Sequence, residues 1–158
     1  MKTHYLLPHH FKKIGWFLFI PGILIGILFL ISQSEPEFLN VRVFSVAVQE
    51  FMGKTVFFSF AKNNIIDEII GLLLITGSIF IAFSKEKSED EFISKIRLES
   101  LVWATYVNYI ILVFAIIFIY DMLFFWVLVF NMFTILFFFI FRFNWVLYKS
   151  KKQILNEE

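Results

Sequence analysis

Four long apolar stretches dominate the chain. Each approaches the roughly 20 apolar residues that a helix needs to cross the hydrocarbon core of a bilayer. Backbone N–H and C=O groups in lipid must be hydrogen-bonded within their own segment, which favours helices over open strands. The pattern predicts an all-α membrane protein, a four-helix transmembrane bundle that forms a single integral-membrane domain over residues 1–158. We place the spans at about residues 14–32, 65–84, 100–120 and 122–142.

The segment between the first two spans has a different pattern. Leu39 to Val48 is rich in Val and Phe with polar residues interspersed, and Thr55 to Phe60 is again β-branched and aromatic. Gly53, which readily takes positive φ, lies in the loop between them. These runs favour a small external β-hairpin at about residues 38–62. It should lie against the membrane surface or the outer helix ends, because an isolated hairpin is marginal in water. An irregular amphipathic loop is the alternative.

Charged residues lead into the third span. Ser88 and Glu91 match a capping box, and Glu91 and Lys95 form a favourable helical charge pair. The pattern predicts a cytoplasmic helix extension at about residues 88–100, either continuous with the third span or bent along the interface. This extension carries an apolar stripe of three residues, Phe92, Ile93 and Ile96. Two interpretations stay open: the extension is a solvated helix end, or the stripe is a surface for a cytoplasmic partner. At the far end of the third span only Asp121 interrupts the apolar sequence, which predicts a tight helical hairpin.

Composition supports lipid as the solvent. Hydrophobic residues make up 59% of the chain and charged residues 17%, against about 25% charged residues in an average soluble domain. A soluble domain of this length has too little interior to bury that much apolar surface. The absence of cysteine excludes disulfides and thiolate metal sites. The net charge of +1 gives no reason to expect direct nucleic acid binding.

The basic residues predict an orientation. Eleven Lys and Arg residues fall in the N-terminal segment, the loop between the second and third spans and the tail, against three on the opposite side. Lys and Arg accumulate on the cytoplasmic side of membrane proteins. We therefore expect a multi-pass protein of the bacterial cytoplasmic (inner) membrane with both termini in the cytoplasm.

Polar residues inside the spans are the candidates for chemistry, because they are costly in lipid. Asn108 and Asn131 lie at similar depths when counted from the turn at Asp121 and are expected to hydrogen-bond. Thr105 and Thr134 are each three residues from one of them. Two interpretations stay open: hydrogen bonds that join the helices, or a polar pocket for a small ligand or lipid headgroup.

The spans carry no ionisable residue well inside them, which argues against a proton-coupled transporter or a haem protein. No catalytic, cofactor or metal site is predicted, so enzymatic activity is disfavoured. Gly22 and Gly26 form a GxxxG pattern in the first span. Close packing within the monomer is the favoured explanation, and an oligomer contact is the alternative.

Some segments resemble uncharacterised small four-span integral-membrane proteins from bacterial genomes. The segments that carry the resemblance are Leu7–Trp16, Ser84–Glu91, Ile96–Leu101 and Arg142–Trp145. It runs along nearly the whole chain and brings no activity or site residue. Such proteins are similar in layout to small membrane proteins encoded beside short helix-turn-helix regulators, which implies a regulatory or accessory role.

The residues and the resemblance together favour a non-enzymatic accessory or regulatory membrane protein with a cytoplasmic protein partner. The first alternative is a small-ligand or lipid binder, or a transporter, that uses the level of Asn108 and Asn131. The least favoured is a membrane enzyme.

Overall fold

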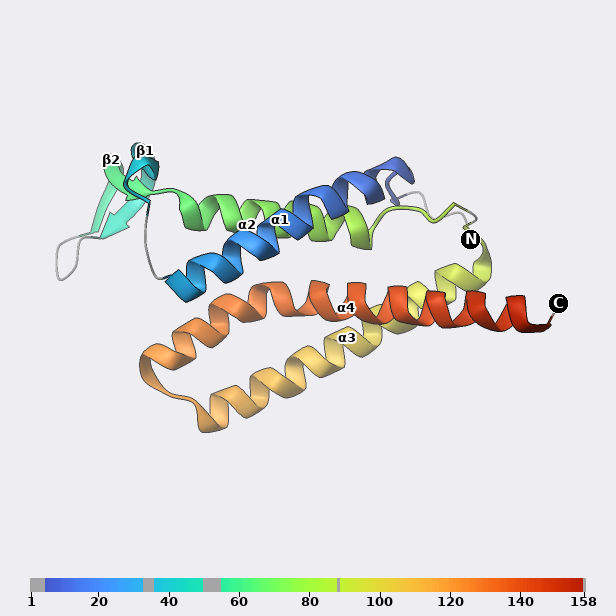
Figure 1. Ribbon diagram of the computed structural model, residues 1–158. Coiled ribbons are helices and arrows are strands. Elements are labelled where there is room, and N and C mark those ends of the chain that lie inside the picture. Colours follow the sequence, from blue (N-terminus) through green and yellow to red (C-terminus); the bar gives the residue numbers. More distant parts are fainter. Residues whose placement is uncertain (1–4, 33–35, 50–54, 88, 158) are drawn as a thin grey trace. The chain divides into compact units, whose positions relative to one another are not determined.

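The computed structural model describes residues 5–32, 36–49, 55–87 and 89–157 (Figure 1). The chain forms two compact units. The first unit holds residues 1–19 and 74–158, and the second holds residues 20–73. Helices α1 and α2 each contribute to both units.

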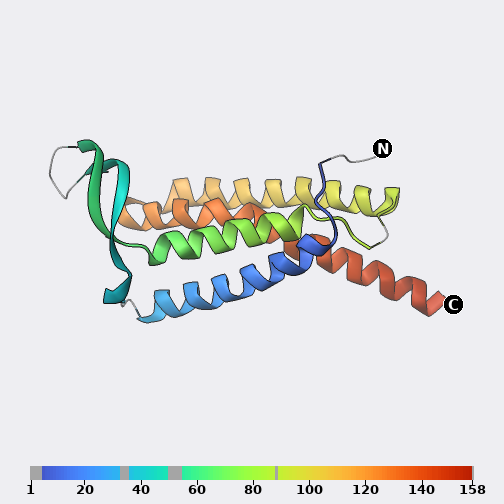
Figure 2. The ribbon, with the colours of Figure 1, turned by 90° about the horizontal axis from the view of Figure 1, so that it is seen from above.

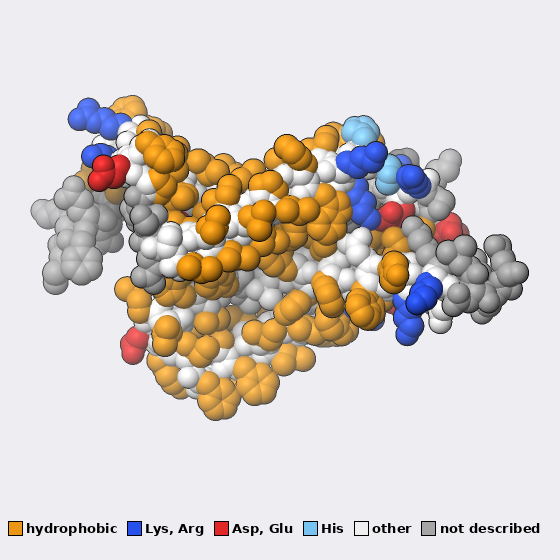
Figure 3. All heavy atoms as spheres, in the orientation of Figure 1, with side chains coloured by type: hydrophobic (Ala, Val, Ile, Leu, Met, Phe, Trp, Pro, Cys, Tyr) orange, Lys and Arg blue, Asp and Glu red, His pale blue; other side chains and the backbone are white. Residues whose placement is uncertain are grey.

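Within the described residues the chain forms four α-helices: α1 (His10–Ser32), α2 (Ile66–Ala82), α3 (Glu91–Phe118) and α4 (Asp121–Glu157). Three of them, α1, α3 and the Asp121–Ser150 part of α4, are long and apolar enough to cross a membrane. Helix α2 has 17 residues and is shorter than these three. Hydrophobic side chains cover much of the visible helix surface (Figure 3).

The first unit contains the antiparallel pair α3–α4, whose helices pack against each other (Figures 1 and 2). Only Ile119 and Tyr120 separate the two helices, as the sequence predicts for a tight hairpin. Asp121, at the start of α4, has a φ of 58°. This left-handed conformation is one that Asp tolerates better than most residues, because its short side chain can hydrogen-bond locally.

Helices α1 and α2 approach closely within the first unit. A Cβ atom placed on Gly77 would lie 2.8 Å from the backbone N of Phe19, and one on Gly15 would lie 2.9 Å from the carbonyl oxygen of Gly77. Both obstacles are backbone atoms, so only glycine fits at these positions. An edge-to-face contact between Phe11 and Phe80, at 5.2 Å between ring centroids, lies between the same helices.

The core of the first unit is aromatic on the side of α4. Phe139 and Phe143 are buried and stack at 5.7 Å between centroids. Phe83, just after α2, stacks on Phe139 at 6.1 Å. Ile81 of α2 and Ala104 of α3 are also buried, so α2, α3 and α4 all contribute to this core.

The second unit contains the β-hairpin, which confirms the predicted pair of strands. Strand β1 (Asn40–Gln49) pairs antiparallel with β2 (Thr55–Asn64), and the short 3-10 helix η1 (Glu37–Leu39) precedes them. The register is constant from Asn40–Asn64 to Gln49–Thr55, with Val46 and Phe58 left unpaired. Phe58 has a φ of 52°, which is rare for a bulky residue and opens the ladder at this point. Gly53 lies outside the described residues.

The start of helix α3 differs from the sequence prediction. Its N-cap is Asp90, whose carboxylate accepts a 2.8 Å hydrogen bond from the backbone N of Ile93. Ser88, the predicted cap, lies outside the described residues, and Glu91 is the first residue of the helix. Both Ser and Asp are good caps, so the sequence alone did not separate the two starts. The predicted continuity holds, because α3 runs unbroken from Glu91 to Phe118.

Helix α4 is also longer than the predicted span. It continues from Asp121 to Glu157, well past residue 142. The added residues include Lys, Gln and Leu and contain neither Gly nor Pro, so good helix formers carry the helix beyond its apolar part.

Candidate functional site

Two ion pairs form a charged cluster in the first unit, close to the start of α1. Lys12 pairs with Glu86 of the loop between α2 and α3, and the two side chains are only 13% and 8% exposed. Arg97 of α3 pairs with Glu89 of the same loop at 3.1 Å, with side chains 11% and 15% exposed. The four charges balance each other, which lowers the cost of burying them.

Arg97 also binds backbone. Its Nη1 donates to the carbonyl oxygen of Ala82 at 2.7 Å, and its Nη2 lies 3.3 Å from that of Ser84. The last carbonyls of a helix lack partners within it, and those at the end of α2 thereby gain a cationic donor, an arrangement that helix C-termini favour. Arg97 therefore fixes the beginning of α3 to the end of α2.

The N-terminal segment closes the cluster. Leu7 and Ser84 form a parallel bridge in which the N–H of Leu7 donates to Phe83 and the N–H of Lys85 donates to Leu7, each at 2.9 Å. His9 Nδ1 lies 2.9 Å from the carbonyl oxygen of Lys85. The residues before α1 are thus hydrogen-bonded to the loop between α2 and α3.

Phe143 of α4 contacts both cations. The Arg97 guanidinium is 4.7 Å from its ring centroid and the Lys12 ammonium is 5.7 Å from it. Lys12 also donates to Asn144 Oδ1 at 3.3 Å. Cation–π contacts gain strength where the cation is shielded from water. The cluster therefore joins all four helices of this unit through two cations and one ring.

Sequence reasoning missed this cluster. The sequence predicts a helix extension at about residues 88–100 that is either a solvated helix end or a partner surface, whereas Glu86 and Glu89 are largely covered. The sequence feature that could have indicated the cluster is the position of Lys12 and Arg97, each at the edge of a long apolar stretch. Charges at such edges need partners, and the loop between α2 and α3 carries acids that can supply them.

The predicted hydrogen bond between Asn108 and Asn131 is present. Asn131 Nδ2 donates to Asn108 Oδ1 at 3.1 Å, joining α3 to α4, and Asn108 is only 4% exposed. The two threonines do not join this pair. Thr105 donates to the carbonyl of Leu101 and Thr134 to that of Phe130, each at 2.9 Å within its own helix. The geometry is that of a contact between helices.

The predicted partner surface at Phe92, Ile93 and Ile96 needs correction. Ile93 and Ile96 are each only 5% exposed, so the chain itself covers them. They share a helix face with Arg97 and Ser100, which are turned toward the rest of the unit. Phe92 remains 55% exposed, and Leu98 is 64% exposed beside the exposed charges of Lys95 and Glu99. We call the four exposed residues Phe92, Lys95, Leu98 and Glu99 the α3 face.

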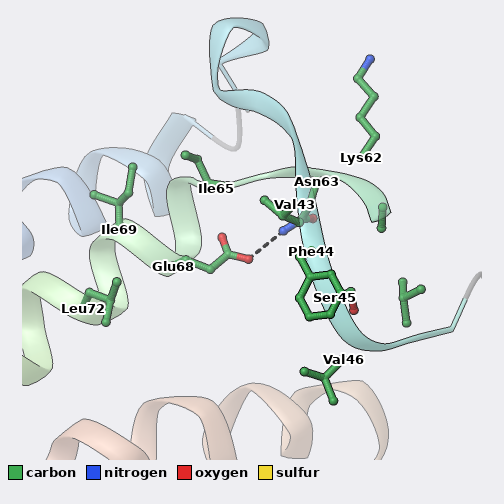
Figure 4. A pocket seen from close by; sticks show the side chains of 12 residues that line it. Val43, Phe44, Ser45, Val46, Lys62, Asn63, Ile65, Glu68, Ile69 and Leu72 are labelled. Carbon is green, nitrogen blue, oxygen red and sulfur yellow. Dashed lines mark hydrogen bonds between the residues drawn. The ribbon is translucent and has the colours of Figure 1, made fainter. Parts of the chain in front are cut away.

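A groove of about 730 Å³ lies between the hairpin and the start of α2 in the second unit (Figure 4). The half-buried face of the sheet, with Val43, Ser45 and Ala61, contributes to one side, and Ile69 and Leu72 contribute to the other. Asn63 Nδ2 donates to Glu68 Oε1 at 2.7 Å within it. The half-buried face of the hairpin thus faces the start of α2.

No family model, curated protein or solved structure matches the chain. Among the described residues, no group of three or more His, Asp and Glu side chains is placed to hold a metal ion.

Proposed function

We propose that this protein crosses the bacterial cytoplasmic membrane four times, with both termini in the cytoplasm. Three helices are long enough to span a bilayer. The fourth, α2, would extend roughly 26 Å at 1.5 Å per residue, close to the roughly 30 Å of the hydrocarbon core. The excess of Lys and Arg in the N-terminal segment, the α2–α3 loop region and the C-terminal tail supports the orientation.

Because the chain has no cysteine, single cysteines report the topology directly. Lys62→Cys is expected to react with a membrane-impermeant maleimide in intact cells. Lys149→Cys is expected to react only after the membrane is opened. Labelling of Lys149→Cys in intact cells would contradict the orientation.

We propose a non-enzymatic accessory or regulatory role, in which the α3 face contacts a cytoplasmic protein. The observation that carries the proposal is that Phe92 and Leu98 are exposed, whereas the opposite side of the same helix turns packs against the rest of the first unit. Ile93, Ile96 and the Arg97 contacts hold the opposite side of the same turns. A preformed apolar surface bordered by charges loses little freedom when a partner binds.

Photocrosslinking tests this role. A photoreactive residue replacing Phe92 is expected to give one discrete protein adduct in cells. The same residue replacing Phe118, an exposed apolar position at the other end of α3, is the matched control and should give lipid adducts. Adding Leu98→Ser should remove the protein adduct while the chain stays in the membrane. Lipid adducts alone from position 92 would overturn the proposal.

We further propose that the exposed face of the hairpin, the face turned away from α2, rests on the outer surface of the cytoplasmic membrane. Phe44, Phe58 and Phe60 are exposed, and the first two rings lie 6.5 Å apart between centroids. Arg42 and Lys62 are cross-strand partners on the same face. Aromatic rings with adjacent basic groups suit the headgroup region. Phe60→Asp should make the hairpin more accessible to protease in vesicles, whereas unchanged cleavage would count against this contact.

A further inference from the structure

A second groove, of about 390 Å³, lies between α1 and α4 within the first unit. Its volume is within the range of about 300–1,000 Å³ that is typical of small-molecule sites. Phe19 and Ile140 are buried at its base. Trp16 lines it from α1, and Phe141 and Trp145 line it from α4. Among the described residues that line it, Asn144 is the one with a polar amide side chain.

The groove changes from apolar to basic along its length. Lys13 lies three residues before Trp16 on α1, and Lys149 lies four residues after Trp145 on α4. Three or four residues are one helical turn. Since α1 begins and α4 ends on the same side of this unit (Figure 1), both lysines lie beyond the tryptophans toward that side. Both lysine side chains are exposed.

The charges that α1 and α4 carry next to the groove have one sign. From His10 to Ser32 there is no Asp or Glu, and from Met122 to Leu155 there is none either. The neighbouring Lys12 is neutralised by Glu86, which comes from the loop between α2 and α3. Figure 3 shows Lys and Arg side chains, with acidic side chains beside them, on the side of the first unit where α1 begins and α4 ends. An occupant of the groove therefore meets apolar side chains, then two indole rings, then positive charge.

We propose that this groove binds an anionic phospholipid, with one acyl chain between Trp16 and Trp145 and the phosphate near Lys13 and Lys149. Indole rings are enriched at the headgroup level of membranes, and basic clusters beside them attract anionic lipids. The Lys12 ammonium has three N–H groups, of which Glu86 and Asn144 take two. This ammonium also lies 5.7 Å from the Phe143 ring centroid, so Lys12 is already held within the chain, and the exposed Lys13 and Lys149 supply the positive charge for the phosphate.

A second helix is a poorer fit to this surface. Helix pairs in lipid associate through small residues that let the backbones approach, whereas this groove is bordered by Trp16, Phe141 and Trp145. Phe141 and Trp145 stack at 6.0 Å between ring centroids and form one wall. A flexible acyl chain fills a narrow slot between bulky rings, and a helix does not.

Fluorescence quenching by brominated lipid tests the proposal. The full chain with Trp103→Phe and Trp126→Phe retains Trp16 and Trp145 as the reporters at the groove. It is reconstituted in phosphatidylcholine bilayers that contain increasing fractions of brominated phosphatidylglycerol. Brominated phosphatidylcholine serves as the uncharged comparison. Selective binding produces quenching at low fractions of the brominated lipid.

We expect the relative binding constant to favour the anionic lipid by about five- to thirty-fold, since each lysine near a membrane surface contributes a factor of about five. Lys13→Gln with Lys149→Gln should lower this preference to near one and leave the fold intact, because both side chains are exposed. Arg42→Gln with Lys62→Gln, an equal loss of charge in the hairpin, should leave it unchanged.

Two results would overturn the proposal. Equal quenching by the two brominated lipids in the unsubstituted reporter chain would show that the groove does not select an anionic headgroup. Protection of both tryptophans from either lipid, together with a dimer in sedimentation, would show that a second copy of the chain fills the groove. Neither result bears on the α3 face, whose photocrosslinking test is separate.

Discussion

The two helix pairs of this protein are held together in different ways. Helices α1 and α2 meet backbone to backbone at Gly15 and Gly77, where no Cβ atom fits. Helices α3 and α4 are joined by a two-residue connection and by the hydrogen bond between Asn108 and Asn131. One contact depends on shape and the other on polar chemistry.

The difference teaches where each pair is vulnerable. Lipid chains are as apolar as the helices, so burial from water does not drive helix association within a bilayer. Close contact and hydrogen bonds must supply the attraction. A steric clash with backbone cannot relax by a side-chain rotation, whereas the loss of one polar pair leaves the surrounding packing in place. Disruption of the α1–α2 contact should therefore cost more.

The largest effect is expected at Arg97, where the two helix pairs are tied together. Arg97→Gln should lower the free energy of unfolding by about 3–5 kcal/mol, the usual cost of breaking a buried ion pair. The carboxylate of Glu89 and the carbonyls of Ala82 and Ser84 would lose their donor. Denaturant unfolding in mild detergent measures the change. Lys95→Gln, on the exposed side of the same helix, is the control, and equal losses would refute the role of Arg97.

Gly77→Ala should have the next largest effect. The new methyl group would lie 2.8 Å from the backbone N and 3.0 Å from the Cα of Phe19. Such overpacking typically costs about 1–3 kcal/mol. Gly71→Ala is the matched control on the same helix, because nothing lies within 4 Å of its added Cβ. Thermal unfolding of the two variants in one detergent distinguishes them, and similar midpoints would show that the close approach is not needed.

A smaller effect is expected for the polar pair. Asn108→Leu and Asn131→Leu should each lower stability by about 0.6 kcal/mol and at most about 1.7, the range of such bonds between membrane helices. The double variant should cost less than the sum, because the first substitution already removes the shared bond. A double-mutant cycle measures the coupling. Strictly additive losses would show that the two side chains do not interact.

The smallest effect is expected at Thr134. Its hydroxyl donates to Phe130 of its own helix, and that carbonyl keeps its place in the backbone pattern when the hydroxyl is removed. Thr134→Val should change the unfolding free energy by no more than about 0.5 kcal/mol. The same titration as for the asparagines measures it. A loss of unfolding free energy as large as that of Asn131→Leu would show that Thr134 contributes to the contact made by Asn108 and Asn131.

The sequence by itself determined the local elements. Long uncharged stretches predicted α1, α3 and α4, and alternation of β-branched and polar residues predicted the hairpin. The pairing of Asn108 with Asn131 was also accessible. A connection as short as the one at Asp121 fixes which residues of two antiparallel helices lie at equal depth. In all these cases the decisive residues are close in sequence or are linked by a very short turn.

Only the tertiary structure decided which faces meet. The sequence pointed to Gly22 and Gly26. Gly22 is buried and a Cβ atom on Gly26 would lie 3.4 Å from Ile70 of α2, as expected for packing within the monomer, but the closest backbone approach of α1 and α2 uses Gly15 and Gly77. The sequence also offered Ile93 and Ile96 as part of a candidate partner surface, although the chain buries them. No local pattern paired Lys12 with Glu86 or Arg97 with Glu89. Which glycines, isoleucines or charges face another element depends on the rotation of each helix about its axis. Residues distant in sequence set that rotation, so no local pattern contains it.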